Sequence, residues 1–304
     1  MFLKKGVTMK KYILIILTFS FCYMQNDING YAIFDYSNAS GDDGFSLNRA
    51  YISYSKDISD ELYFKIRLDT KKPTGSRSVF VKNAYVDWKC ENGDKLSMGL
   101  IGTNSYGVQE KNWGYRFIEK SVLDKYGMTN TADLGVGYSR NFGKIKSNIQ
   151  LLNGEGFNDQ DYDHKQALYT SILYGESNIV ENDGINCGVV LNHSPQANGI
   201  DNNLIGFFGG WASNDIRLGI EYNTYETDIT EEAIAIYANY DLSDEWDVFL
   251  RYDSNDLDID DEVDAVDLTI LGGVWNPTKG LYISPNVYLY DDANTYRLTC
   301  MFKY

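Results

Sequence analysis

The chain has 304 residues, of which 25 are tyrosine, 27 glycine and only 4 proline, and its formal net charge is −16. This acidic balance argues against nucleic-acid binding, which requires a basic surface. A soluble chain of this length often divides into two domains. A membrane barrel is an exception, because lipid outside and water inside replace a large packed core.

The N-terminal segment 1–24 is predicted to be a signal peptide. Two lysines, Lys10 and Lys11, precede the apolar run 12–19, and this order of a charged and a short apolar region is typical of export signals. A lipid anchor on Cys22 is the alternative, but the bulky residue before this cysteine disfavours it. No other stretch approaches the roughly 18 apolar residues of a membrane helix, so a membrane protein of this sequence must be a closed barrel.

The remainder, 25–304, repeats one unit of about ten alternating residues followed by turn residues. In 61–70, for example, one row is Leu62, Phe64, Ile66 and Leu68, and the opposite row is Tyr63, Lys65, Arg67 and Asp69. A period of two predicts a strand whose two faces meet different solvents. The pattern predicts an all-β transmembrane antiparallel β-barrel of about 16 strands, near 28–37, 45–56, 61–70, 78–89, 94–103, 131–142, 144–153, 165–176, 183–192, 203–213, 214–224, 230–242, 245–254, 265–276, 280–290 and 293–304.

The connections between these strands alternate in length. Every second one is mostly tight, such as Phe142-Gly143 and Ser213-Asn214, and the others are mostly longer and polar. Short turns at one rim and longer loops at the other are typical of bacterial outer-membrane barrels. The last strand ends on Tyr304, the final member of an apolar and aromatic row. This ending is similar to the C-terminal signal of outer-membrane proteins.

The longest connection, 104–130, is the third external loop, and its apolar residues around 117–126 predict a short helix. A long loop with structure of its own is usually functional. We expect this loop to fold inward and narrow the pore. The alternative is an external loop that lies over the rim.

Several of these segments resemble the phosphate-selective porin O/P family of outer-membrane porins over residues 45–155. The resemblance rests on FSLNRAY at 45–51, ISDELYFKIRLD at 58–69, AYVDW at 84–88, FIEKS at 117–121 and DLGV at 133–136. It implies a 16-stranded barrel, commonly a homotrimer, with the third loop in the lumen. Asn104-Ser105-Tyr106-Gly107 departs from the family's Pro-Phe-Gly-like step, and no run of closely spaced basic residues supports phosphate selectivity.

Candidate pore-lining or constriction residues are the charged side chains in the polar row of each predicted strand, together with charged residues of the third loop. They are Arg49, Lys65, Arg67, Asp87, Arg116, Glu119, Lys120, Arg217, Glu221, Arg251 and Arg297. Opposed charges across a narrow pore order water and disfavour apolar solutes. The alternative is that these side chains pair with one another and only keep the lumen wet.

The acidic run 253–264 lies in a predicted external loop. A calcium site is conceivable there, but the run lacks the glycine of an EF-hand loop. A solvated loop, bridged to lipopolysaccharide by divalent ions, is the preferred interpretation. Its field would enrich cations at the mouth, which predicts weak cation selectivity.

No catalytic site, metal site or cofactor is predicted. The two histidines, His164 and His193, lie in predicted loops, and the cysteines have no metal-ligand spacing. We therefore predict an outer-membrane porin for passive diffusion of small hydrophilic solutes and ions, surrounded by lipid and lipopolysaccharide. The alternatives are a non-conducting structural or adhesive barrel and a soluble secreted β protein, although no propeller repeat is present.

Overall fold

A computed structural model describes residues 26–38, 43–71, 77–157, 164–260, 265–291 and 293–304. The predicted signal peptide and the end of the acidic loop, 261–264, lie outside these residues.

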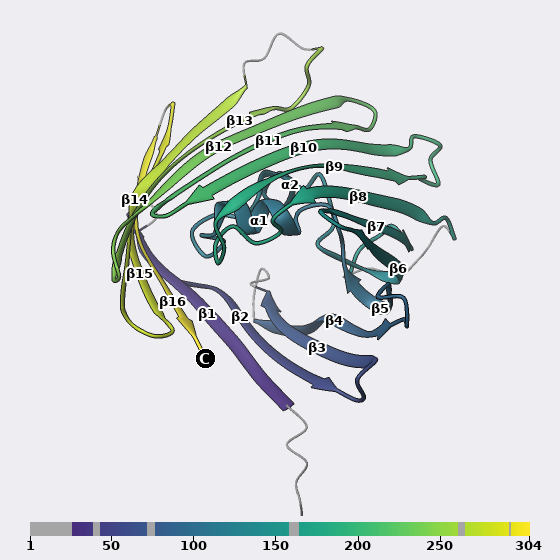
Figure 1. Cartoon of the computed structure of the whole chain (residues 1–304). Helices are drawn as coiled ribbons and strands as arrows, with labels where there is room; N and C mark the ends of the chain where they lie inside the picture. The colour runs from purple at the N-terminus through teal and green to yellow at the C-terminus, as the bar shows by residue number, and fades with distance from the viewer. Residues whose placement is uncertain (1–25, 39–42, 72–76, 158–163, 261–264, 292) are drawn as a thin grey trace, which may run out of the picture.

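Sixteen strands form one closed antiparallel barrel in which each strand pairs with its neighbours along the chain and β1 pairs with β16 (Figure 1). The predicted fold class is confirmed, and each predicted segment overlaps one strand. The strands are β1 (Asn26–Asn38), β2 (Gly44–Asp57), β3 (Leu62–Lys71), β4 (Ser78–Lys89), β5 (Lys95–Gly102), β6 (Ala132–Phe142), β7 (Ile145–Leu152), β8 (Ala167–Gly175), β9 (Gly184–Ser194), β10 (Asn202–Ser213), β11 (Ile216–Glu226), β12 (Thr230–Ser243), β13 (Trp246–Asp256), β14 (Val266–Thr278), β15 (Leu281–Tyr290) and β16 (Asn294–Lys303).

The two faces of the barrel wall differ in polarity, as β11 illustrates. Ile216, Leu218 and Ile220 are exposed on the outside, whereas Arg217 and Glu221 are buried on the inside. Leu250 of β13 and Ile236 of β12 continue the outer apolar surface. An apolar outer band around a polar interior is the arrangement of a transmembrane barrel. Within the described ranges, no helix has the length and apolar character to cross a membrane.

The barrel is closed by pairing between its first and last strands, β1 and β16. β1 and β16 pair from Tyr31 opposite Lys303 to Asn38 opposite Tyr296. The backbone of Gly30 exchanges two further hydrogen bonds with Tyr304, at 3.3 and 3.1 Å. Tyr304 therefore extends the ladder to Gly30, and the seam is paired from Gly30 to Asn38, as a closed barrel in lipid requires.

Because the outer surface of the barrel is apolar, a charged side chain placed on it should lower the free energy of unfolding, most strongly at the midplane of the membrane. Ile172, near the middle of β8, is exposed on the outer face, whereas Ser171 alternates to the lumen face. An arginine at a lipid-facing midplane position costs about 2–4 kcal/mol. I172R should therefore lower the free energy of unfolding in phospholipid vesicles by about that amount, measured by urea titration. S171R places the same side chain toward water and should change the free energy far less; equal losses would contradict the assigned faces.

Candidate pore and constriction site

The connection between β5 and β6, residues 103–131 and here called L3, folds into the barrel (Figure 1). It contains two helices, α1 (Gly107–Trp113) and α2 (Val122–Lys125). The predicted inward course is thus seen in the structure. The longer helix lies earlier than predicted, and the predicted helical region holds only the single turn α2. Gly114 ends α1 in the left-handed conformation with φ 82°, which favours glycine.

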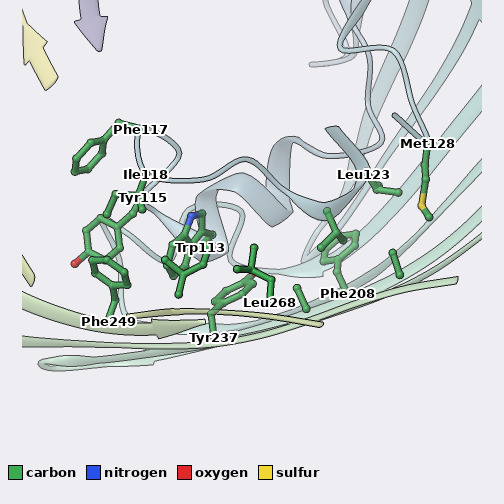
Figure 2. Packing of buried hydrophobic residues seen from close by; sticks show 14 of the residues in the cluster. Trp113, Tyr115, Phe117, Ile118, Leu123, Met128, Phe208, Tyr237, Phe249 and Leu268 are labelled. Carbon is green, nitrogen blue, oxygen red and sulfur yellow. The ribbon is translucent and has the colours of Figure 1, made fainter. Parts of the chain in front are cut away.

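Apolar side chains attach L3 to the inner wall (Figure 2). Trp113 is fully buried, and its ring centroid lies 5.4 Å from that of Tyr237 on β12 and 5.6 Å from that of Phe249 on β13. Leu123 and Met128 belong to the same cluster. The loop therefore has a small hydrophobic core of its own within the lumen, which fixes it against one side of the barrel.

Polar contacts hold the backbone of α1 on the same wall. The side chains of Asn112 and Asn186 donate to each other at 2.9 and 2.8 Å, and both residues are buried. The carbonyl of Trp113 accepts from Asn239 Nδ2 at 3.0 Å. These hydrogen bonds satisfy polar groups that the loop removes from water.

A buried ion pair fastens the second half of L3. Lys125 Nζ lies 2.9 Å from Asp253 Oδ2, and the same carboxylate lies 2.6 Å from Arg251 Nε. Arg251 and Asp253 have no exposed side-chain surface. One carboxylate thus compensates two cations, one from the loop and one from the wall.

Three predicted pore residues are covered by L3, and their assignment as pore-lining is corrected. Arg217, Glu221 and Arg251 do face the inside of the barrel, but all three are buried between the wall and the loop. Arg217 Nη2 instead donates to the carbonyl of Trp113 at 3.4 Å. The alternation of a strand shows which residues face inward, but it does not show where a loop excludes them from the water path.

The uncovered tip of L3 presents a charged group centred on Arg116. Arg116 Nε lies 2.5 Å from Glu110 Oε1, and its Nη2 lies 3.0 Å from Asp124 Oδ2. Lys120 Nζ is 3.3 Å from the other oxygen of Asp124. Burial raises the pKa of Glu110, and the neighbouring guanidinium of Arg116 opposes this rise. As the pH falls through the raised pKa, this group becomes more positive.

Basic side chains gather on the inner wall of β2 to β4. Arg49 and Arg67 each place their guanidinium carbon 5.0 Å from the ring centroid of Tyr51. Arg49 Nε also lies 3.6 Å from Asp69 Oδ2. Lys65 and Lys82 extend this basic wall, and with Arg67 and Arg116 they line one cavity of about 210 Å³. The sequence shows no run of basic residues, but the sheet brings them together from three strands.

Lys82 is a site residue that the sequence pattern did not reveal. The pairing of β3 and β4 shifts register between Arg67 and Leu68, so that Lys82 has no partner in the ladder. Such a bulge interrupts the alternation of the strand. Lys82 and its neighbour Asn83 are both buried on the inside, where strict alternation would place only one of them. Glu110 and Asp124 were also not predicted, because loop residues have no periodic pattern.

Two cavities meet at Arg116. The outer one, toward the long loops, measures about 440 Å³ and includes Asp35, Glu119 and Arg297. The inner one, toward the short turns, measures about 510 Å³ and includes Ser53 and Lys303. They share three lining residues, Ile33, Arg116 and Phe117. We call the region between them the neck.

The other predicted residues lie at or near this path. Arg49, Lys120 and Arg297 line the outer cavity with Glu119, and Arg67 lines the inner one. Asp87 lies further toward the short-turn rim, where Lys95 Nζ contacts it at 3.0 Å. It is not among the residues that line the neck cavities. No described group of His, Cys, Asp and Glu side chains has a geometry suited to a metal ion.

A closed sixteen-stranded barrel with an apolar outer surface, a charged interior and a loop folded inward is the architecture of the porin-type transmembrane β-barrels of bacterial outer membranes. Known structures share this fold. OmpF of Salmonella typhi, in complex with daunomycin, aligns with a TM-score of 0.71 and 12% identity over 92% of this chain and 97% of that chain. The trimer form of OmpT of Vibrio cholerae gives 0.67 and 14% over 92% and 99%.

The outer membrane channel DcaP of Acinetobacter baumannii is also similar, with a TM-score of 0.64 and 12% identity over 92% of this chain and 97% of that chain. At such low identities the likeness is one of fold. Neither the models of known protein families nor the curated proteins match this sequence.

Proposed function

We propose that the protein is a porin that lets small hydrophilic solutes and ions diffuse passively across the outer membrane. The observation that carries the proposal is the pair of cavities that meet at the neck. L3 packs on the wall from β7 to β15, whereas on the side of β2 to β4 polar cavities separate much of the loop from the basic wall. A structural or adhesive barrel with a blocked lumen is the alternative, and it would need no such charged passage.

The neck favours anions over cations by a small margin. Arg49 in the outer cavity and Lys65, Arg67 and Lys82 in the cavity beside the neck face a loop tip in which Arg116 is already paired with acids. The narrowest part of a pore dominates selectivity, because permeating ions come closest to its charges there. The proposed sign is opposite to the expectation drawn from the acidic run 253–264. The first part of this run, 253–256, lies in strand β13, and Asp253 is buried beside Arg251, so this part is not in an external loop.

The proposal also includes a homotrimeric assembly and a surrounding of lipid and lipopolysaccharide. The resemblance to the porin O/P family over residues 45–155 and the trimer form of Vibrio cholerae OmpT both support a homotrimer. Lipid and lipopolysaccharide would surround the apolar outer face. Chemical cross-linking in native outer membranes should yield dimers and trimers but no larger species.

Solute flux into liposomes tests the proposal directly. Vesicles that contain the folded protein should swell in isotonic solutions of small sugars, and the rate should fall as the sugar becomes larger. A heat-modifiable, correctly folded barrel that gives no swelling with any sugar would favour the structural or adhesive alternative.

A further inference from the structure

The inner cavity has a charge opposite to that of the whole protein. It is lined by Arg67, Arg116 and Lys303, and none of its described lining residues has an acidic side chain. Tyr304 lies at its edge, where the carbonyl oxygen of this residue accepts from Gly30 N at 3.3 Å. In a chain of net charge −16, such a lining selects for anionic occupants.

The same cavity has an apolar and aromatic side. Tyr31 and Tyr51 pack edge to face with their ring centroids 4.8 Å apart. Ile33, Phe117 and Met301 complete this side. A small hydrated anion gains nothing from such a surface, whereas an apolar ring gains by leaving water and contacting it.

Arg67 is placed to bind the charge of such a ligand. Its guanidinium lies against the Tyr51 ring, and its Nε donates to Ser53 Oγ at 3.0 Å. Arg49 and Arg116 have carboxylate partners, but Arg67 has none among the residues that the structure describes. A planar guanidinium held on a ring offers its remaining donors to a carboxylate in a fixed orientation.

We propose that the inner cavity binds carboxylates that have an apolar body of about the size of one ring, with Arg67 as the charge partner and Met301 with the tyrosine rings as the apolar wall. The inference rests on the proposed channel function, and it names the class of solute that the channel retains on its way through. Pockets that combine an apolar lining with a few placed polar groups are typical of small-molecule sites.

Equilibrium binding and current block test this site separately. Saturation-transfer NMR on the detergent-folded protein should detect benzoate and cyclohexanecarboxylate but not acetate. The same two acids should reduce the current through a planar bilayer in a concentration-dependent manner. Benzyl alcohol, which has the ring without the charge, controls for partition into lipid or detergent and should have no effect.

Three variants assign the effect to the cavity. R67Q should raise the half-blocking concentration of benzoate by about tenfold or more, since it removes a charge-assisted contact. M301Q should raise it by about threefold through the loss of apolar contact. R140Q, on the exposed outer side of β6, is the matched control and should behave as wild type. Heat-modifiable gel migration verifies folding of each variant.

The outcomes separate this inference from the proposed function. Benzoate binding that R67Q weakens, in a protein that does not conduct, would support the site and refute the channel. Conduction in which benzoate acts no more strongly than acetate would overturn the site and leave the channel intact. Equal effects of R67Q and R140Q would likewise overturn the assignment to this cavity.

Discussion

D253A should lower the free energy of unfolding by about 3–5 kcal/mol, because it leaves buried cations without their counter-charge. Asp253 lies 2.6 Å from Arg251 Nε and 2.9 Å from Lys125 Nζ, and it is fully buried. Removal of the carboxylate therefore affects both the barrel wall and the attachment of L3. Urea titration of the protein in phospholipid vesicles, followed by tryptophan fluorescence, measures the change.

Two further variants make this prediction specific. D253N keeps the shape and one hydrogen-bond acceptor, so its loss should be smaller than that of D253A. D241A removes an exposed carboxylate at the short-turn rim and should change the free energy by no more than about 0.5 kcal/mol. A D253A protein as stable as D241A would show that the ion pair does not hold L3 to the wall.

The second large effect is expected in ion selectivity. A unit charge about 8 Å from a permeating ion in water contributes about 0.5 kcal/mol, or about twofold in relative permeability. The double variant K65Q/K82Q removes two cations from the cavity of about 210 Å³ beside the neck and should shift the anion-to-cation permeability ratio toward cations by about fivefold at low ionic strength. Reversal potentials in a potassium chloride gradient give this ratio.

A matched pair outside the neck controls for net charge. K89Q/K144Q removes two cations from exposed positions near the short-turn rim and should leave the ratio almost unchanged. If both double variants shift the reversal potential equally, selectivity follows the total charge of the protein. The neck would then have no special role.

The strands could be predicted because lipid and water impose a strict period of two. In β11, Ile216 to Tyr222 alternate with Arg217 to Asn223 without interruption, and the barrel exposes the first row and buries the second. Bulges such as the one at Lys82 break this rule, because an extra residue in one strand leaves no mark in the composition of the segment. The pattern therefore determines the face of nearly every strand residue, although it does not determine its partners.

The constriction could be predicted only in outline. The length and apolar content of 104–130 indicated an inward loop, but the side on which it docks depends on contacts such as Trp113 with Tyr237 and Phe249. These residues are far apart in the sequence and have no shared pattern. For this reason Arg251 and Arg49 look alike in the sequence, whereas one is buried behind the loop and the other lines the outer cavity.

The most direct test of the porin assignment is the current through the purified, folded protein in a planar bilayer under a salt gradient. A water-filled pore with a basic neck predicts discrete conductance steps, grouped in threes for a trimer, and a reversal potential of the anion-selective sign. A cation-selective sign would contradict the role given to the neck. A folded barrel that inserts but never conducts would contradict the channel itself.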